Sequence, residues 1–286
     1  MNEKVWHFGT NKSLVGVVAD PPADKVDPNK PAIILLNSGL LHRVGPSRLH
    51  VQLARKMAAD GFITFRFDFS GIGDSPRRRD ELSFDESSIL EARVAMDFIS
   101  SKRDVKKFVL SGICSGADAA FFTACEDSRI AGIVPIDLFT QFSKGYMIES
   151  YKKRLFSTRG WSNILTGKSD IFKMLKQVPA NLKAVKITPE TADEPGDTSQ
   201  TLSAERWVEG FHILNKNGVK LCLIYSAGSP AFYNYRQHFE KPLQSLNPEN
   251  QTRVHHMDSA DHGFTLLFHQ AQLITLIAEW MRFYFS

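Results

Sequence analysis

A five-residue segment, Gly112-Ile113-Cys114-Ser115-Gly116, is the feature of this chain that most constrains its fold. Its glycines stand two residues before and two after a central cysteine, which is the spacing of a G-x-S-x-G turn with cysteine in place of serine. Residues 107–111 are typical of a short buried strand, and residues 117–122 of the start of a helix. A strand, a sharp glycine-dependent turn and a helix are the context that this motif requires. We therefore expect an exposed Cys114 at a helix N-terminus, where free amides favour the thiolate.

Apolar runs alternate with helical segments along most of the chain. Strands are expected over residues 4–9, 13–19, 32–36, 62–67, 107–111, 130–136, 220–225 and 253–257. Helical spacing occupies residues 47–60, 87–100 and 270–285. Continuous apolar strands are typical of a sheet that is covered on both faces. The pattern predicts an α/β fold with a mostly parallel sheet between two layers of helices.

One segment interrupts this alternation. Residues 138–218 contain no convincing core strand, but they hold helix-like pieces at 142–156, 169–177 and 203–215 and a polar loop at 188–198. We expect residues 1–137 and 219–286 to form the core, and residues 138–218 to form a helical lid inserted before the penultimate strand. Such an insertion would lie over the carboxyl ends of the strands, where open α/β sheets bind ligands. The alternative is a separate helical subdomain with a structural or partner-binding role.

Composition excludes several classes of protein. The 286 residues are 43% hydrophobic and 23% charged, and the net charge of +4 is too small to favour nucleic acid as the main partner. No apolar run is long enough to span a bilayer and no signal peptide is visible, so a cytoplasmic location is expected. Cys114, Cys125 and Cys222 lack the spacing of a metal site, so neither a metal nor another cofactor is expected.

A cysteine nucleophile needs a base, and His262 is the candidate. In folds with this turn the chain order is nucleophile, acid and histidine, and the histidine follows the last strand. His262 lies in that position, between the expected last strand and the final helix. His255 and His256 lie within the strand itself, so they cannot reach the turn.

The acid that would orient this histidine is ambiguous. The turn after the penultimate strand has no carboxylate, because Ser229 occupies the expected slot. Asp137 follows the strand before it and could reach the imidazole from one side. Alternatively, Asp137 caps a helix of the lid. A third alternative is that no acid exists, since a thiol is acidic enough to work with histidine alone.

Two backbone amides are expected to form an oxyanion hole. They are the amide of Ser115, which follows the nucleophile, and that of Leu40, in the loop after the third strand. His42 and Arg43 follow in the same loop and would bind a carboxylate or phosphate of the substrate if they face the cleft. The alternative for Arg43 is a solvated side chain, and for Arg48 a role within the scaffold.

These motifs resemble the α/β-hydrolase superfamily over nearly the whole chain. Asp68-x-x-Gly71-x-Gly73-x-Ser75 resembles the loop that this family carries after its fourth strand. The pattern Gly39-x-x-His42-Arg43-Val44-Gly45-x-x-Arg48 is similar to that of serine-aminopeptidase-like and exosortase-associated hydrolases. Dienelactone hydrolases of the same superfamily also carry a cysteine at the turn. The resemblance implies Cys114 as nucleophile and His262 as base, and the chain departs from the common pattern at Cys114 and Ser229.

Three functions are compatible with these residues. The first is hydrolysis of an ester or thioester through a Cys-His(-Asp) acyl-enzyme. The second is acyl transfer, in an acyltransferase or thioesterase-like enzyme that offloads a lipid or polyketide from its assembly. The third is a non-catalytic ligand-binding homologue. The expected partner is a small-molecule acyl substrate, free or carrier-bound.

Overall fold

The computed structural model describes residues 2–141, 146, 203–227, 229–246 and 251–286. The chain forms two compact units, residues 1–141 with 204–286 and residues 142–203. The first unit carries the sheet and every element below. The expected helices at 142–156 and 169–177 and the polar loop at 188–198 lie outside the described residues. No helix in the described part of the chain is both long and apolar enough to cross a membrane.

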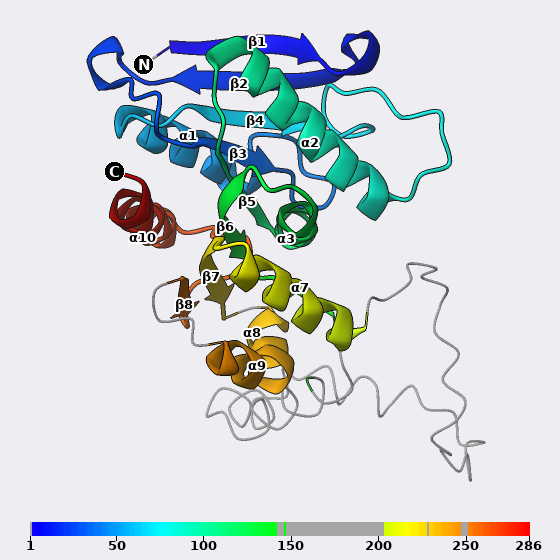
Figure 1. Cartoon of the computed structure of the whole chain (residues 1–286), viewed down its shortest axis with the longest axis vertical. Helices are drawn as coiled ribbons and strands as arrows, with labels where there is room; N and C mark the ends of the chain where they lie inside the picture. Colours follow the sequence, from blue (N-terminus) through cyan, green and yellow to red (C-terminus); the bar gives the residue numbers. More distant parts are fainter. Residues whose placement is uncertain (1, 142–145, 147–202, 228, 247–250) are drawn as a thin grey trace, which may run out of the picture. The chain divides into compact units, whose positions relative to one another are not determined.

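Eight strands form one sheet in the order β1-β2-β4-β3-β5-β6-β7-β8 (Figure 1). They are β1 (Asn2–Phe8), β2 (Leu14–Asp20), β3 (Ala32–Leu36), β4 (Thr64–Asp68), β5 (Phe108–Ile113), β6 (Ile130–Ile136), β7 (Lys220–Ser226) and β8 (Thr252–Met257). β2 pairs antiparallel with β1 and β4, and all other pairs are parallel. The mostly parallel sheet expected from the sequence is confirmed.

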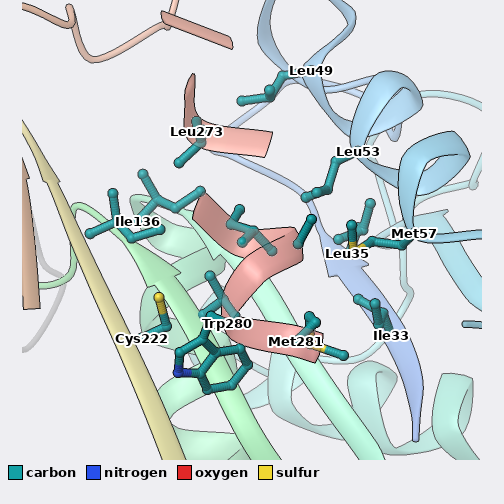
Figure 2. Packing of buried hydrophobic residues seen from close by; sticks show 14 of the residues in the cluster. Ile33, Leu35, Leu49, Leu53, Met57, Ile136, Cys222, Leu273, Trp280 and Met281 are labelled. Carbon is teal, nitrogen blue, oxygen red and sulfur yellow. The ribbon is translucent and has the colours of Figure 1, made fainter. Parts of the chain in front are cut away.

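Helices α1 (Leu49–Ala59) and α10 (Leu267–Phe285) cover one face of this sheet (Figure 1). Their apolar side chains pack on alternate residues of the central strands, as Figure 2 shows for Leu53 beside Leu35 and Trp280 beside Cys222. Burial of such apolar area, at about 25 cal/mol per Å², is the main force that holds the helices on the sheet. The carboxyl ends of β3, β5 and β6 are thereby fixed relative to one another.

The other face carries α2 (Phe84–Arg103), α3 (Ser115–Glu126) and α7 (Ala204–Lys216). α7 packs on α3 through aromatic rings: the centroid of Phe121 lies 4.9 Å from that of Trp207 and 4.8 Å from that of Phe211. The expected helix at 203–215 therefore belongs to the unit that carries the sheet. The second compact unit spans 142–203, a shorter segment than the 138–218 expected for the lid.

Helix α2 begins before the expected residue 87 because of a capping box. The Ser83 hydroxyl accepts a hydrogen bond from the Glu86 amide, and the Glu86 carboxylate accepts one from the Ser83 amide. This reciprocal pair satisfies two donors that would otherwise lack a partner at the helix start.

Several short helical elements complete the described chain. They are η1 (Thr10–Lys12), η2 (Ala23–Lys25), η3 (Pro46–Arg48), α8 (Ala231–Asn234), the π-helical turn η4 (Tyr235–Phe239) and α9 (Glu240–Ser245). The last three follow β7 and were not anticipated. Tyr235 of η4 packs its ring 5.1 Å from that of Tyr225 at the end of β7. These elements therefore border the carboxyl end of β7.

Candidate active site

Cys114 lies between β5 and α3 in a backbone conformation that side chains rarely adopt, with φ 55° and ψ −122°. The turn is tight enough to require both flanking glycines. A Cβ on Gly112 would lie 2.4 Å from the carbonyl carbon of Gly116, and a Cβ on Gly116 would lie 2.3 Å from the Asn37 oxygen. The Cys114 amide donates to the Ile136 oxygen at 3.0 Å, which ties the turn to the end of β6. The thiol is therefore held at the start of α3, half-buried.

Asp137 and His262 are in direct contact. Oδ2 of Asp137 lies 2.6 Å from Nδ1 of His262. Asp137 immediately follows β6, and its side chain is fully buried, whereas that of His262 is 41% exposed. The Asp137 carboxylate also accepts hydrogen bonds from the Ser226 amide at 2.7 Å and the Ser226 hydroxyl at 2.6 Å. These bonds fix the carboxylate on the imidazole.

This contact bears on the alternatives for Asp137. A helix cap would place the carboxylate on amides of the residues that follow it. Its described partners are instead Ser226 and His262, and the Phe139 amide donates to a different residue, Asp118, at 3.1 Å. The geometry favours Asp137 as the group that orients His262.

The electrostatics link His262 to Cys114. The hydrogen bond that His262 donates to Asp137, the interaction with Cys114 and the negative charge of both groups raise the pKa of His262 to about 10. The hydrogen bond with His262 lowers the pKa of Cys114, with smaller help from Thr140, against an opposing effect of burial. A base with a raised pKa beside an acid with a lowered one favours a thiolate–imidazolium pair.

The two amides expected to hold an oxyanion belong to segments that one hydrogen bond joins. The Ser115 amide is the first of α3 and so has no partner within the helix. The Ser115 hydroxyl accepts from the Gly39 amide at 2.9 Å, which ties the loop after β3 to the turn. Leu40 follows Gly39 directly, and its side chain is 92% exposed. The loop that carries the Leu40 amide is thus anchored on the residue next to Cys114.

Comparison with known proteins bears on the fold. No family model and no curated protein matches the sequence. Among solved structures, an esterase from Pyrococcus furiosus is 14% identical with a TM-score of 0.62, over 100% of this chain and 92% of that one. A serine hydrolase homologue from Coxiella burnetii is 12% identical with a TM-score of 0.55, over 98% and 97%. A serine hydrolase without a lid from Xanthomonas campestris is 12% identical with a TM-score of 0.52, over 100% and 95%.

This chain has the α/β-hydrolase fold. In this fold the nucleophile turn, the oxyanion loop and the histidine loop come together at the carboxyl ends of the strands. Cys114, Leu40 and His262 lie after β5, β3 and β8 respectively. The acid candidate departs from the common arrangement, since Asp137 follows β6. Ser229, which follows β7, accepts from the Ala231 amide at 3.1 Å at the start of α8.

Arg43 of the α/β-hydrolase scaffold forms ion pairs with two aspartates. Its guanidinium pairs with the buried carboxylate of Asp68 and, at 2.7 Å, with that of Asp74. Asp68 ends β4 and lies against the glycine-rich loop that follows, where a Cβ on Gly73 would lie 2.4 Å from the Asp68 carboxylate. Arg43 thus holds the loop after β3 against this second loop. Its expected contact with substrate stays a prediction.

His42 and Arg48 are both exposed near this loop. Arg48 has a positive φ of 64° and precedes α1 directly. His255 and His256 lie in β8 as expected, and the His256 ring stacks on Phe232 with 3.8 Å between centroids. Among the described residues no group of histidine, cysteine, aspartate and glutamate side chains could hold a metal ion.

Four polar residues of the site were not identified from the sequence. They are Ser226, which holds Asp137, Thr140, which lies in the segment after β6, and Asp118 and Asn234, which bond the backbone of that segment. Each comes from a different element or a different turn, and no spacing along the chain links them to Cys114. The order of neighbouring strands brings them together.

Proposed function

We propose that the protein is a hydrolase that cleaves an ester or thioester through a covalent acyl group on Cys114. The observation that carries this proposal is the 2.6 Å contact between Asp137 and His262, together with the opposite pKa shifts that His262 and Cys114 induce in each other. It supplies a nucleophile, a base and a group that orients the base, in an architecture whose neighbours include an esterase.

The reaction has two halves. The Cys114 thiolate attacks the substrate carbonyl, and the amides of Ser115 and Leu40 stabilise the negative oxygen that forms. Protonated His262 gives its proton to the departing alkoxide or thiolate, which leaves an acyl thioester on Sγ. Neutral His262 then takes a proton from water, and the hydroxide adds to the thioester carbonyl. Collapse expels the Cys114 thiolate and releases the acid, and the proton on His262 restores the starting pair.

Acyl transfer differs from this scheme only in the second half. A thioester on Cys114 is reactive toward alcohols, amines and thiols as well as toward water, and the same His262 would take the proton from any of them. Transfer and hydrolysis are therefore separated by products. We expect free acid from water alone, and a second acyl product where an acceptor competes.

The test compares Cys114→Ala with Cys125→Ala on chromogenic esters and acyl thioesters. Cys125 is a matched control because it is also partly buried, but burial raises its pKa to about 12. We expect Cys114→Ala to lose activity by at least about 10³-fold, and Cys125→Ala to keep it. Intact-mass measurement of a quenched reaction should find one acyl group on the wild type and none on Cys114→Ala. Equal turnover by both variants would exclude Cys114 as the nucleophile.

A further inference from the structure

The segment after β6 is held in an unusual shape. Asp137 and Phe139 both have positive φ, of 53° and 60°, which is rare for residues with a Cβ. Side chains from two other elements secure it. Asp118 of α3 accepts from the Phe139 amide at 3.1 Å, and Asn234 of α8 donates to the oxygens of Phe139 and Gln141, both at 2.8 Å. Backbone strain of this kind persists only where the surroundings enforce it.

This shape brings a second side chain of the segment onto the nucleophile. Oγ1 of Thr140 lies 3.4 Å from Sγ of Cys114, within hydrogen-bond range for sulfur. Either atom could donate in the neutral state. In a thiolate–imidazolium pair the sulfur has no proton and can only accept, so the hydroxyl must donate. The segment therefore touches both partners of the pair, with Asp137 on His262 and Thr140 on Cys114.

We propose that Thr140 is a further catalytic residue of this site, whose hydroxyl donates a hydrogen bond to the Cys114 thiolate. Asp118 and Asn234 are positioning residues that hold Thr140 in place through the backbone. The catalytic role of Thr140 rests on the proposed function, whereas its contact with Cys114 does not.

The hydroxyl would act at two points. In the resting enzyme it stabilises the thiolate relative to the thiol and holds Sγ in one orientation. In the second half-reaction the C–S bond breaks, the electron pair returns to sulfur, and the hydroxyl again meets a negative acceptor. Thr140 therefore favours both formation of the nucleophile and its expulsion from the tetrahedral intermediate.

Other charged groups also act on Cys114. Protonated His262 lowers the pKa of the thiol, and the carboxylate of Asp118 raises it from the α3 side. Asp118 itself has a pKa raised to about 7, chiefly by burial. A measurement of Thr140 must leave these two groups in place, which argues for substitutions at position 140 alone.

The decisive pair of variants is Thr140→Val and Thr140→Ser. Valine keeps the branched shape and removes the hydroxyl, whereas serine keeps the hydroxyl. The readout is the rate of Cys114 alkylation by iodoacetamide as a function of pH, with the modified peptide identified by mass spectrometry. Because burial raises the pKa of both Cys125 and Cys222, Cys114 should be the thiol that reacts below neutral pH.

We expect the midpoint of alkylation to rise by about one pH unit in Thr140→Val, as for loss of one hydrogen bond to a charged group. Thr140→Ser should restore a midpoint near that of the wild type. On a thioester substrate, kcat should fall more than about tenfold in the valine variant with little change in KM. An unchanged midpoint in Thr140→Val, or a serine variant that behaves like valine, would overturn the proposal.

The alkylation assay needs no turnover, so it separates the two proposals. If Cys114→Ala left turnover unchanged, the acyl-enzyme would fail while a shifted midpoint still established the Thr140 contact. If Thr140→Val did not fold, Thr140→Ala against Thr140→Ser would give the same comparison. A normal midpoint with lost activity would refute the role at the thiolate.

Discussion

Asp137 Oδ2 and His262 Nδ1, 2.6 Å apart, join the ends of two strands that are not neighbours in the sheet. Asp137 follows β6 and His262 follows β8, and β7 runs between them. The end of β7 contributes Ser226, which donates both its amide and its hydroxyl to the carboxylate. The Asp137 carboxylate is thus oriented by Ser226 of β7, the strand whose following turn has no carboxylate.

Replacement of the carboxylate tests this arrangement. We expect Asp137→Asn to lower kcat/KM by about 10²-fold, less than the roughly 10⁴-fold typical of a serine triad, because a thiolate needs less help from the base. The measurement is steady-state hydrolysis of a chromogenic ester. Asp261→Asn is the matched control, since Asp261 adjoins His262 but accepts hydrogen bonds from Thr265. Equal losses in both variants would contradict the role of Asp137.

The pH profile follows from the two shifted pKa values. Activity should fall at low pH, as Cys114 takes up a proton below its lowered pKa, and at high pH, as His262 loses its proton near pH 10. A plot of kcat/KM against pH should therefore have a broad plateau that extends into the alkaline range. In Asp137→Asn the alkaline limb should move to lower pH, because the main cause of the raised pKa is gone. An alkaline limb at the same pH in Asp137→Asn would argue against a thiolate–imidazolium pair of Cys114 and His262.

Exchange of sulfur for oxygen tests how complete the site is. A hydroxyl depends on its base for deprotonation, and Asp137 with His262 supplies one. We expect Cys114→Ser to lose sensitivity to iodoacetamide but to hydrolyse esters measurably faster than Cys114→Ala. Ester turnover with and without prior alkylation checks both points. Identical residual rates in the two variants would mean that the base and acid cannot activate a hydroxyl here.

The turn itself should tolerate no added methyl group. In Gly116→Ala the new Cβ would lie 2.3 Å from the Asn37 oxygen, a backbone atom that cannot move aside. We expect a loss of about 3 kcal/mol in the free energy of unfolding, measured with urea. Gly263→Ala is the control, because its nearest contact would be an ordinary 3.4 Å. A small loss at Gly116 would show that the loop after β3 can yield.

The ion pairs of Arg43, which hold the loop after β3, can be removed separately. Arg43→Met would leave the fully buried Asp68 carboxylate without its guanidinium partner. Loss of one partner of a buried pair costs about 3 kcal/mol, so the urea midpoint should fall clearly. Arg48→Met, at an exposed position, should change stability by less than about 0.5 kcal/mol. If Arg43→Met instead raised KM at unchanged stability, Arg43 would bind substrate, as its position after the loop first suggested.

Much of the fold was predictable because its signals are local. Continuous apolar runs such as 32–36 identified the buried strands, and glycine spacing at 112 and 116 identified the turn. The elements missed were those without a regular period. η4 is a π-helical turn between two short helices, so residues 231–245 never show the 3.6-residue repeat of one helix. The segment 203–215 was recognised as helical, but its attachment to α3 depends on aromatic packing between distant residues.

The candidate site divides in the same way. Cys114 and His262 could be located because each follows a strand at a characteristic point of the chain. Asp137 stayed one of three alternatives, since its reach to His262 depends on which strands are neighbours. Thr140 had no signal at all, because its approach to Cys114 needs two positive φ angles in the segment after β6.

The hydrogen bond from the Cys114 amide to the Ile136 oxygen has a consequence for how such sites change over time. This bond links the turn at Cys114 directly to Ile136, the residue before Asp137. A carboxylate at position 137 is therefore held at a fixed place relative to the turn. A chain could carry acids after both β6 and β7 and then lose either one. In distantly related sequences, a candidate acid should therefore be sought after each of the strands β6 and β7, and not at a fixed number of residues before the histidine.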